Sequence, residues 1–245
     1  MKRGDFDMSV YACTDLHGRK DLYTKIKEIL QPEDKVFYLG DAGDRGPDGW
    51  ELIKTIYEDD QFEYIKGNHE DMLIASMWAY QRNPEVESRA FLLLKRNGGE
   101  YTFQDWWKDG ANMDWASRLD ELPVHAEYIN KDGIVVLMSH AGYTPWLDEE
   151  NPDKITIPDE FELIWNRDHI YEDWNEEWFK NCVVVHGHTP IPHLMDRLND
   201  KNPDIVVGAY WYENNKKVCI DNLSAFSGIA CLLNLDTFEE TIIKK

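Results

Sequence analysis

The chain has 245 residues, of which 26 are basic and 47 acidic, giving a formal net charge of −21 at pH 7. A chain of this length can bury a substantial core, and we expect one domain over residues 1–245. The acidic balance, without a cluster of Lys and Arg, argues against nucleic-acid and anionic-membrane partners. No run approaches the roughly 20 apolar residues of a membrane span, and the basic N-terminus lacks the apolar core of a signal peptide, so we expect a cytoplasmic protein.

The first third of the chain alternates short apolar runs with helical patterns. Residues 10–13, 36–39 and 62–65 are predicted to be buried strands. Apolar residues between Leu22 and Leu30 repeat at helical spacing, and a second helix is expected to begin at Pro47, a favoured first helical position. This alternation predicts βαβ units and a largely parallel sheet.

From about Asp71 to Leu122 the pattern is helical, with a break at Asn97-Gly98-Gly99. It predicts a helical insertion beside the sheet. The insertion's tryptophans, Trp106, Trp107 and Trp115, could line a substrate groove, but packing against the sheet is the interpretation that we prefer.

Strand patterns return after Pro123, at residues 124–129, 134–138, 183–185, 205–207, 218–220 and 229–235. Several follow Gly or Asn turn signals, so a second, mixed or antiparallel sheet is expected. Loops are expected at residues 148–158 and 198–204. Four cysteines lie in apolar runs without Cys-x-x-Cys spacing, and we expect buried free thiols in a reducing compartment: Cys13, Cys182, Cys219 and Cys231.

Side chains that bind metals follow the ends of the predicted strands. They are Asp15 and His17 after the first strand, Asp41 after the second, Asn68 after the third, and His140 and His188 after two later strands. Because loops at the carboxyl ends of parallel strands meet in one crevice, we expect these side chains to converge. Six ligands exceed the three of a catalytic zinc and suit two metal ions that share a carboxylate. Imidazole mixed with carboxylate and amide oxygen favours manganese, iron or zinc over calcium.

Three blocks carry a specific resemblance. Asp-x-His-Gly at 15–18, Gly-Asp-x-x-Asp-Arg-Gly at 40–46 and Gly-Asn-His-Glu at 67–70 resemble the signatures of the serine/threonine phosphoprotein phosphatase family within the calcineurin-like metallophosphoesterases. Segments 139–142, 164–167 and 187–190 resemble its bacterial and bacteriophage branch, and the match runs from about Val10 to Asp221. The resemblance implies an α/β fold, a sandwich of two mixed β-sheets flanked by helices, with the helical insertion after the third strand.

The resemblance also implies a role for each matched residue. Two divalent metals, manganese first with iron or zinc as alternatives, would be held by Asp15 and His17 on one side, by Asn68, His140 and His188 on the other, and by a bridging Asp41. His69 would be the general acid, oriented by Asp44. Arg45 and Arg167 would hold the phosphate oxygens and supply the positive charge that an anionic substrate needs.

Each residue also has an ordinary structural interpretation. Aspartates and Asn often cap helices or form turns, and single histidines are usually packed in a core or exposed. The joint pattern favours a catalytic metal site over these alternatives. His186, beside an expected ligand, is interpreted as a packing or supporting residue, and three histidines fit no pattern: His125, His169 and His193.

Three departures from the family pattern leave the ligands in place. Thr14 stands where the family has Gly, Ala141 follows His140 where the family has Gly, and residues 220–225 replace the Asp-Thr-Gly-Ala of bacterial relatives. These changes could alter how the backbone approaches the metals or how the substrate enters.

We therefore expect a metal-dependent phosphatase that acts by in-line attack of a metal-bridging hydroxide. Its expected substrates are phosphoserine or phosphothreonine in proteins, or a small phosphoester. The alternative is hydrolysis of dinucleoside polyphosphates such as diadenosine tetraphosphate, against which stand Asp44 before Arg45 and Glu70 after His69. A non-catalytic metal-binding scaffold is a third hypothesis, which the retained catalytic residues oppose.

Overall fold

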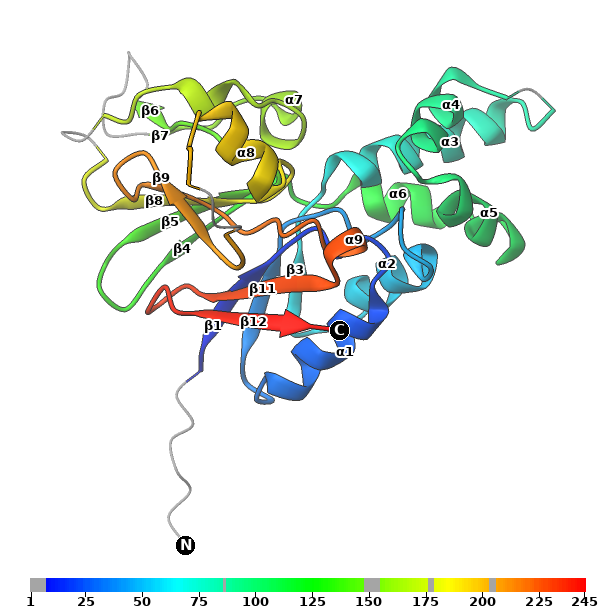
Figure 1. Cartoon of the computed structure of the whole chain (residues 1–245). Helices are drawn as coiled ribbons and strands as arrows, with labels where there is room; N and C mark the ends of the chain where they lie inside the picture. The colour runs from blue at the N-terminus through cyan, green and yellow to red at the C-terminus, as the bar shows by residue number, and fades with distance from the viewer. Residues whose placement is uncertain (1–7, 86, 148–154, 176–178, 203–205) are drawn as a thin grey trace, which may run out of the picture.

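The computed structural model describes residues 8–85, 87–147, 155–175, 179–202 and 206–245, and Figure 1 labels its elements. The first half contains β1 (Val10–Cys13), α1 (Lys20–Ile29), β2 (Lys35–Tyr38), α2 (Gly49–Tyr57), β3 (Phe62–Tyr64), α3 (Asn68–Arg82), α4 (Arg89–Arg96), α5 (Glu100–Lys108) and α6 (Asp114–Asp120). The second half contains β4 (His125–Ile129), β5 (Val135–Ser139), β6 (Trp146–Leu147), β7 (Ile155–Thr156), α7 (Glu160–Ile164), the 3₁₀ helix η1 (Asp168–Tyr171), β8 (Cys182–His186), α8 (Ile191–Arg197), β9 (Tyr210–Tyr212), β10 (Lys217–Cys219), α9 (Ser224–Ser227), β11 (Ile229–Asn234) and β12 (Glu240–Lys244).

Two five-stranded mixed sheets form the centre of the structure. The first sheet has the order β12-β11-β1-β2-β3, and its β1, β2 and β3 are parallel. The second sheet has the order β4-β5-β8-β10-β9, with β5, β8 and β10 parallel. Antiparallel strands lie on one side of the parallel ones in the first sheet (β11 and β12) and on both sides in the second (β4 and β9), so the expected pair of mixed sheets is confirmed.

The two sheets pack face to face through alternate residues of their strands. Val10 and Ala12 of β1 meet Val136 of β5 and Val185 of β8 in one buried apolar cluster. Cys13 of β1 points the other way, into a cluster with helices α1 and α2. This period of two is what a strand buried on both faces requires.

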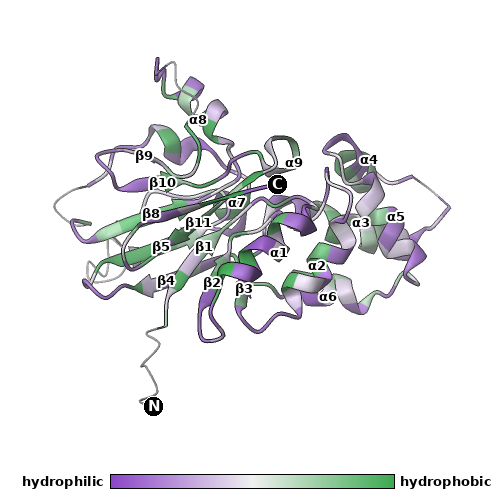
Figure 2. Ribbon diagram, turned by 60° about the horizontal axis from the view of Figure 1, so that its bottom comes forward, coloured by the Kyte–Doolittle hydropathy of each residue, from purple (hydrophilic) through white to green (hydrophobic). Residues whose placement is uncertain are grey.

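Helices cover the outer faces of the sandwich. In Figure 1 the helices of the insertion, α3 to α6, extend to one side, whereas α7 and α8 lie near the second sheet. Figure 2 shows apolar colour on the central strands and hydrophilic colour on the outward faces of the helices. No helix among the described residues is both long enough and apolar enough to span a membrane.

Most predicted elements are present, with four corrections. The second helix begins at Gly49 and not at Pro47, and the insertion's first helix already begins at Asn68. Residues 206 and 207 are not in a strand, and Ile205 lies outside the described residues. In the predicted loop 148–158, residues 148–154 also lie outside the described residues, and residues 155–156 form β7.

The expectations for cysteine and tryptophan are largely confirmed. All four cysteines are buried and free. Trp106 and Trp115 pack in the core, as preferred, but their ring contacts among the described residues are with side chains of α2, α3 and α5 and not with the sheet. Trp107 differs, because its side chain is 54% exposed.

Candidate active site

The six expected metal ligands converge where parallel strands of both sheets end. Asp15 and His17 follow β1, Asp41 follows β2, and Asn68 begins the helix after β3. From the second sheet, His140 follows β5 directly and His188 follows β8. The sandwich therefore brings the carboxyl ends of five strands to one place, as strand order predicts.

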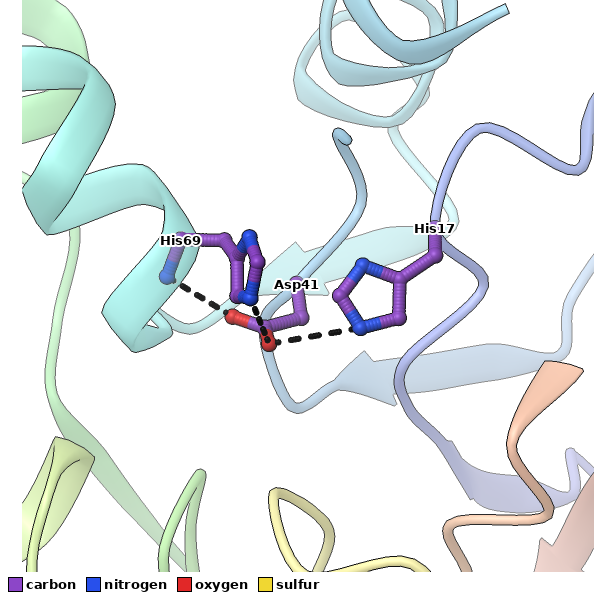
Figure 3. A group of neighbouring side chains, drawn as sticks. All are labelled: His17, Asp41 and His69. Atoms are coloured by element: carbon purple, nitrogen blue, oxygen red, sulfur yellow. Dashed lines mark hydrogen bonds and ion pairs between the residues drawn. The ribbon is translucent and has the colours of Figure 1, made fainter. Parts of the chain in front are cut away.

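Asp41 lies at the centre of this group. Its Oδ2 is 3.5 Å from His17 Nε2 and 3.7 Å from His69 Nε2, and its Oδ1 is 3.4 Å from His140 Nε2. Figure 3 shows the Asp41 carboxylate between the imidazoles of His17 and His69. Two groups able to hold a metal share this carboxylate, His17-Asp41-His69 and Asp15-Asp41-His140. These groups divide the side chains differently from the expectation, since His69 takes the place of Asp15 beside His17, and Asp15 lies with His140. A carboxylate shared by two groups is what a pair of bridged metals needs.

Asn68 and His188 close the second group. The Asn68 Oδ1 lies 2.9 Å from His140 Nε2 and 2.8 Å from His188 Nδ1. His188 Nε2 faces the Trp165 carbonyl at 3.1 Å, so Nδ1 is the nitrogen that points to the cluster. The expected ligands of the second metal are thus within contact of one another.

Thr14, which stands where the family has Gly, helps to hold the side chain of Asp15. Its hydroxyl donates to Asp15 Oδ2 at 2.7 Å, and the His188 backbone N–H donates to the same oxygen at 3.0 Å. The other oxygen, Oδ1, lies 3.6 Å from His17 Nε2. Asp15 is therefore held by one oxygen and presents the other to the cluster.

The electrostatics of the cluster fit divalent cations. Burial is the main cause that lowers the pKa of His17, His140 and His188, which favours the neutral imidazole that binds metals. Burial also raises the pKa of Asp41 well above its usual value, and the nearby carboxylate of Asp15 raises it further. Such crowded, buried acids need a cation to remain ionised, and the donor set of imidazole, carboxylate and amide oxygen suits a transition metal.

Positive φ angles recur in the loops that carry the site. Asp15 (51°), His17 (45°), Asp41 (59°) and Asp44 (67°) adopt left-handed backbone, which side chains other than Gly rarely adopt. Gly46 lets these loops approach closely, since a Cβ there would lie 2.1 Å from the His17 carbonyl oxygen. The motif's glycine is thus explained by backbone packing.

Glu70 holds the Asp41 loop, a role that the motif comparison missed. Its fully buried carboxylate accepts from the backbone N–H groups of Asp41 (2.8 Å), Ala42 (3.0 Å) and Gly67 (2.9 Å) and from the Tyr64 hydroxyl (2.8 Å). Its position as the third residue of α3 is a helix-capping signal that could have indicated this role. Glu70 is a brace for the metal-binding loop.

The expected acid and its partner are in contact. His69 Nδ1 lies 2.6 Å from Asp44 Oδ2, and its Nε2 lies 2.8 Å from a guanidinium nitrogen of Arg45. A second guanidinium nitrogen of Arg45 lies 2.6 Å from His17 Nε2. The Asp44 backbone N–H donates to Thr102 Oγ1, and burial raises the pKa of Asp44 to about 7. Asp44 thus fixes the ring so that Nε2 points into the cluster.

Arg167 reaches the site from the segment before η1. Its Nε donates to Thr189 Oγ1 at 3.1 Å, beside His188. The buried Lys217 of β10 supports the same segment, because its Nζ donates to the carbonyls of His169 (2.5 Å) and Glu172 (3.0 Å). No sequence pattern pointed to Lys217, which forms these contacts with residues 45 or more positions away.

The remaining histidines follow the sequence interpretation. His186 is a buried packing residue whose Nε2 lies 2.8 Å from the Tyr212 hydroxyl. His125 and His193 make no contact with the metal ligands in the described part of the chain. His169, expected to have no role, is buried against His186 with a ring-centroid distance of 5.0 Å.

The sequence model of the calcineurin-like phosphoesterases matches residues 8–218. The chain belongs to this family. Among curated calcineurin-like relatives, the asymmetrical bis(5'-nucleosyl)-tetraphosphatase of Oceanobacillus iheyensis is 26% identical over 210 residues, 78% of this chain and 79% of that protein. A symmetrical bis(5'-nucleosyl)-tetraphosphatase of Buchnera aphidicola is 39% identical over 145 residues, 58% of this chain and 47% of that protein, so this chain spans about half its length.

Solved structures show that the calcineurin-like fold is shared more widely. A candidate diadenosine tetraphosphatase superposes with a TM-score of 0.60 at 15% identity, over 98% of this chain and 94% of that one. A protein serine/threonine phosphatase from Saccharomyces cerevisiae gives 0.52 at 13% identity, over 99% and 82%. At these identities the likeness concerns the fold alone. The expected calcineurin-like family is confirmed. The expected serine/threonine phosphatase branch is not, because the curated relatives are named as tetraphosphatases.

Proposed function

We propose that this metallophosphoesterase hydrolyses dinucleoside polyphosphates such as diadenosine tetraphosphate. The observation that carries the proposal is that curated relatives of both the symmetrical and the asymmetrical kind bear this activity in their names, and one matches over most of both chains. The site adds support, because two metal-binding groups that share Asp41 suit displacement at phosphorus.

In this proposal the chain's own residues divide the work. The metals would be held by Asp15, His17, Asp41, Asn68, His140 and His188. When bound, they supply an activated water and neutralise charge on the phosphate. Arg45 and Arg167 orient the phosphate oxygens, since a guanidinium presents paired donors to an oxyanion. His69 delivers a proton from Nε2 to the departing oxygen, and Asp44 holds its ring at Nδ1.

A phosphoserine or phosphothreonine phosphatase is the second candidate, and one observation favours it. The close His69–Asp44 pair provides a general acid, which an alkoxide leaving group needs more than a nucleotide phosphate does. In the sequence, Glu70 also stands against the dinucleoside polyphosphates, but it is weaker evidence about the substrate, because its carboxylate is fully used in bracing backbone N–H groups.

A comparison of substrates with one manganese-loaded sample tests the proposal. We expect kcat/KM for diadenosine tetraphosphate to exceed that for a phosphoserine peptide by at least tenfold. Separation of the products distinguishes two ADP from ATP plus AMP. A preference for the peptide would refute the proposal and favour the second candidate, and no hydrolysis of either substrate with any metal would favour the non-catalytic scaffold. Asp41→Asn is the control, since hydrolysis that survives it comes from a contaminant.

A further inference from the structure

A pocket of about 440 Å³ lies beside Arg167, between residues 142–146 and 157–172. Its wall includes Asn166 and Asp168, the two neighbours of Arg167 in sequence, and Gly142, two residues after His140. Consecutive Cα atoms are 3.8 Å apart, so the backbone of the pocket wall lies directly beside the backbone of Arg167, the residue assigned to bind phosphate. The Arg167 backbone N–H also donates to Asn166 Oδ1 at 2.7 Å, which ties the pocket wall to the arginine.

The lining of this pocket combines an aromatic face with carboxylates. Trp146, 46% exposed, and Pro158 give it an apolar side. Asp159, Glu162, Asp168 and Glu172 give it an acidic side, and its described lining residues include no Lys or Arg. A phosphate would be repelled here, whereas a neutral group with hydrogen-bond donors would be accepted.

Two buried polar side chains also line the pocket without a partner. The Tyr143 hydroxyl and both ring nitrogens of His169 have no hydrogen-bond partner among the described residues. Both side chains are more than nine-tenths buried. These atoms are enclosed in the pocket wall, so they make the wall polar, and the exposed aromatic and acidic side chains are the groups that can contact a ligand.

We propose that this pocket binds the nucleoside at one end of the dinucleoside polyphosphate, and this inference rests on the proposed function. The base stacks on Trp146, and the ribose hydroxyls donate to the carboxylates, Asp168 foremost because it follows Arg167 directly. The polyphosphate then leaves the acidic pocket at the point where Arg167 can hold it. The neutral and the anionic parts of the substrate are thus bound by separate surfaces of matching charge.

A second pocket, of about 460 Å³, provides the matched control. It lies in the helical insertion and is lined by Ser76, Tyr80, Phe103 and Trp107. Ser76 is eight residues beyond Asn68 in α3, or about 12 Å along the helix axis. Trp107 is exposed to a similar degree as Trp146 and lines the pocket of the insertion instead, so its replacement controls for loss of an exposed indole.

The experiment measures KM for diadenosine tetraphosphate and for p-nitrophenyl phosphate with manganese, in wild type, Trp146→Ala, Asp168→Asn and Trp107→Ala. Loss of base stacking is expected to raise KM for the dinucleotide about five- to a hundredfold in Trp146→Ala. The increase in KM for p-nitrophenyl phosphate, which has no nucleoside, should be at least fivefold smaller than the increase for the dinucleotide. Adenosine should inhibit wild-type hydrolysis competitively and Trp146→Ala much less.

The outcomes separate this inference from the proposed function. If wild type hydrolyses the dinucleotide but Trp146→Ala and Asp168→Asn keep its KM, the pocket proposal is wrong and the function stands. A KM effect confined to Trp107→Ala would place the nucleoside in the insertion and also overturn it. If wild type hydrolyses p-nitrophenyl phosphate but not the dinucleotide, the proposed function fails. Should the pocket variants then raise KM for a basic phosphopeptide, the pocket binds a cationic side chain instead.

Discussion

Replacement of Glu70 by Gln removes the brace beneath Asp41 with a minimal change in shape. The carboxylate accepts two hydrogen bonds at each oxygen: Asp41 and Gly67 N–H at Oε2, and Ala42 N–H and the Tyr64 hydroxyl at Oε1. In Glu70→Gln, one oxygen becomes an NH₂ group that cannot accept. With the NH₂ group at the Oε2 position, the N–H groups of Asp41 and Gly67 lose their acceptor. With it at the Oε1 position, it can donate to the Tyr64 hydroxyl oxygen, and only the Ala42 N–H loses its acceptor.

The size of the effect follows from the charge on the acceptor. Hydrogen bonds to charged groups contribute about 1.5–3 kcal/mol each, so loss of one or two should lower the free energy of unfolding by about 1.5–6 kcal/mol. Because Asp41 keeps its left-handed backbone (φ 59°) through these contacts, manganese affinity should also fall at least tenfold.

Urea unfolding of the metal-free protein, followed by tryptophan fluorescence, measures the first effect, and calorimetric titration with manganese measures the second. Tyr64→Phe is the control, since it removes one hydrogen bond, should cost about 1.5–3 kcal/mol and leaves all three backbone N–H groups with their acceptor. A Glu70→Gln protein that unfolds within about 1 kcal/mol of wild type and binds manganese normally would refute the brace.

Three further predictions concern the acid, the phosphate arginine and the buried lysine. His69→Asn should lower turnover of p-nitrophenyl phosphate at least about 10²-fold while manganese content stays at the wild-type level; loss of one metal per chain would instead make His69 a ligand. Arg167→Lys should raise KM for diadenosine tetraphosphate about tenfold in steady-state assays, because an ammonium cannot reproduce the paired donors of a guanidinium, and an unchanged KM would remove Arg167 from the site. Burial lowers the pKa of Lys217 from 10.5 to about 8, although the nearby carboxylates of Glu213, Glu172 and Asp173 act to raise it. Between these pH values the unfolded chain binds more protons, so wild type should gain up to about 3 kcal/mol of unfolding free energy relative to Lys217→Met as pH rises from 8 to 10.5. A constant difference in urea unfolding across this range would contradict the prediction.

The metal-binding loops were predictable because each follows an apolar strand. Short runs such as Val36 to Leu39 identify a buried strand, and parallel strands present their carboxyl ends together. The order of strands therefore indicates that Asp41 and Asn68 converge, without knowledge of any contact. The family resemblance then assigned roles that strand order cannot supply.

The residues that support the site were not predictable in this way. Lys217 contacts the segment after Arg167 only because β10 lies beside β8 in the second sheet, which depends on the whole chain being folded. Thr189 Oγ1 likewise accepts a hydrogen bond from Arg167 Nε, a residue 22 positions away. Such long-range hydrogen bonds leave no periodic pattern in the sequence.

Two strand errors have opposite causes. Val206 is apolar because it packs with the α8 cluster, although its segment forms no ladder. It leads to Gly208, whose N–H donates to the Asn222 side chain at 2.7 Å. Conversely, β12 escaped prediction because it is an edge strand with mostly exposed side chains, so its apolar alternation is weak.

Anomalous diffraction from manganese-loaded crystals tests most directly whether Asp41 is shared by two metals. The account predicts two peaks separated by about 3.5–4 Å, with an Asp41 carboxylate oxygen bound to both ions. Asn68, His140 and His188 should surround one of them. A single peak, or two ions with no common contact to Asp41, would contradict the two-metal site on which the proposed hydrolysis depends.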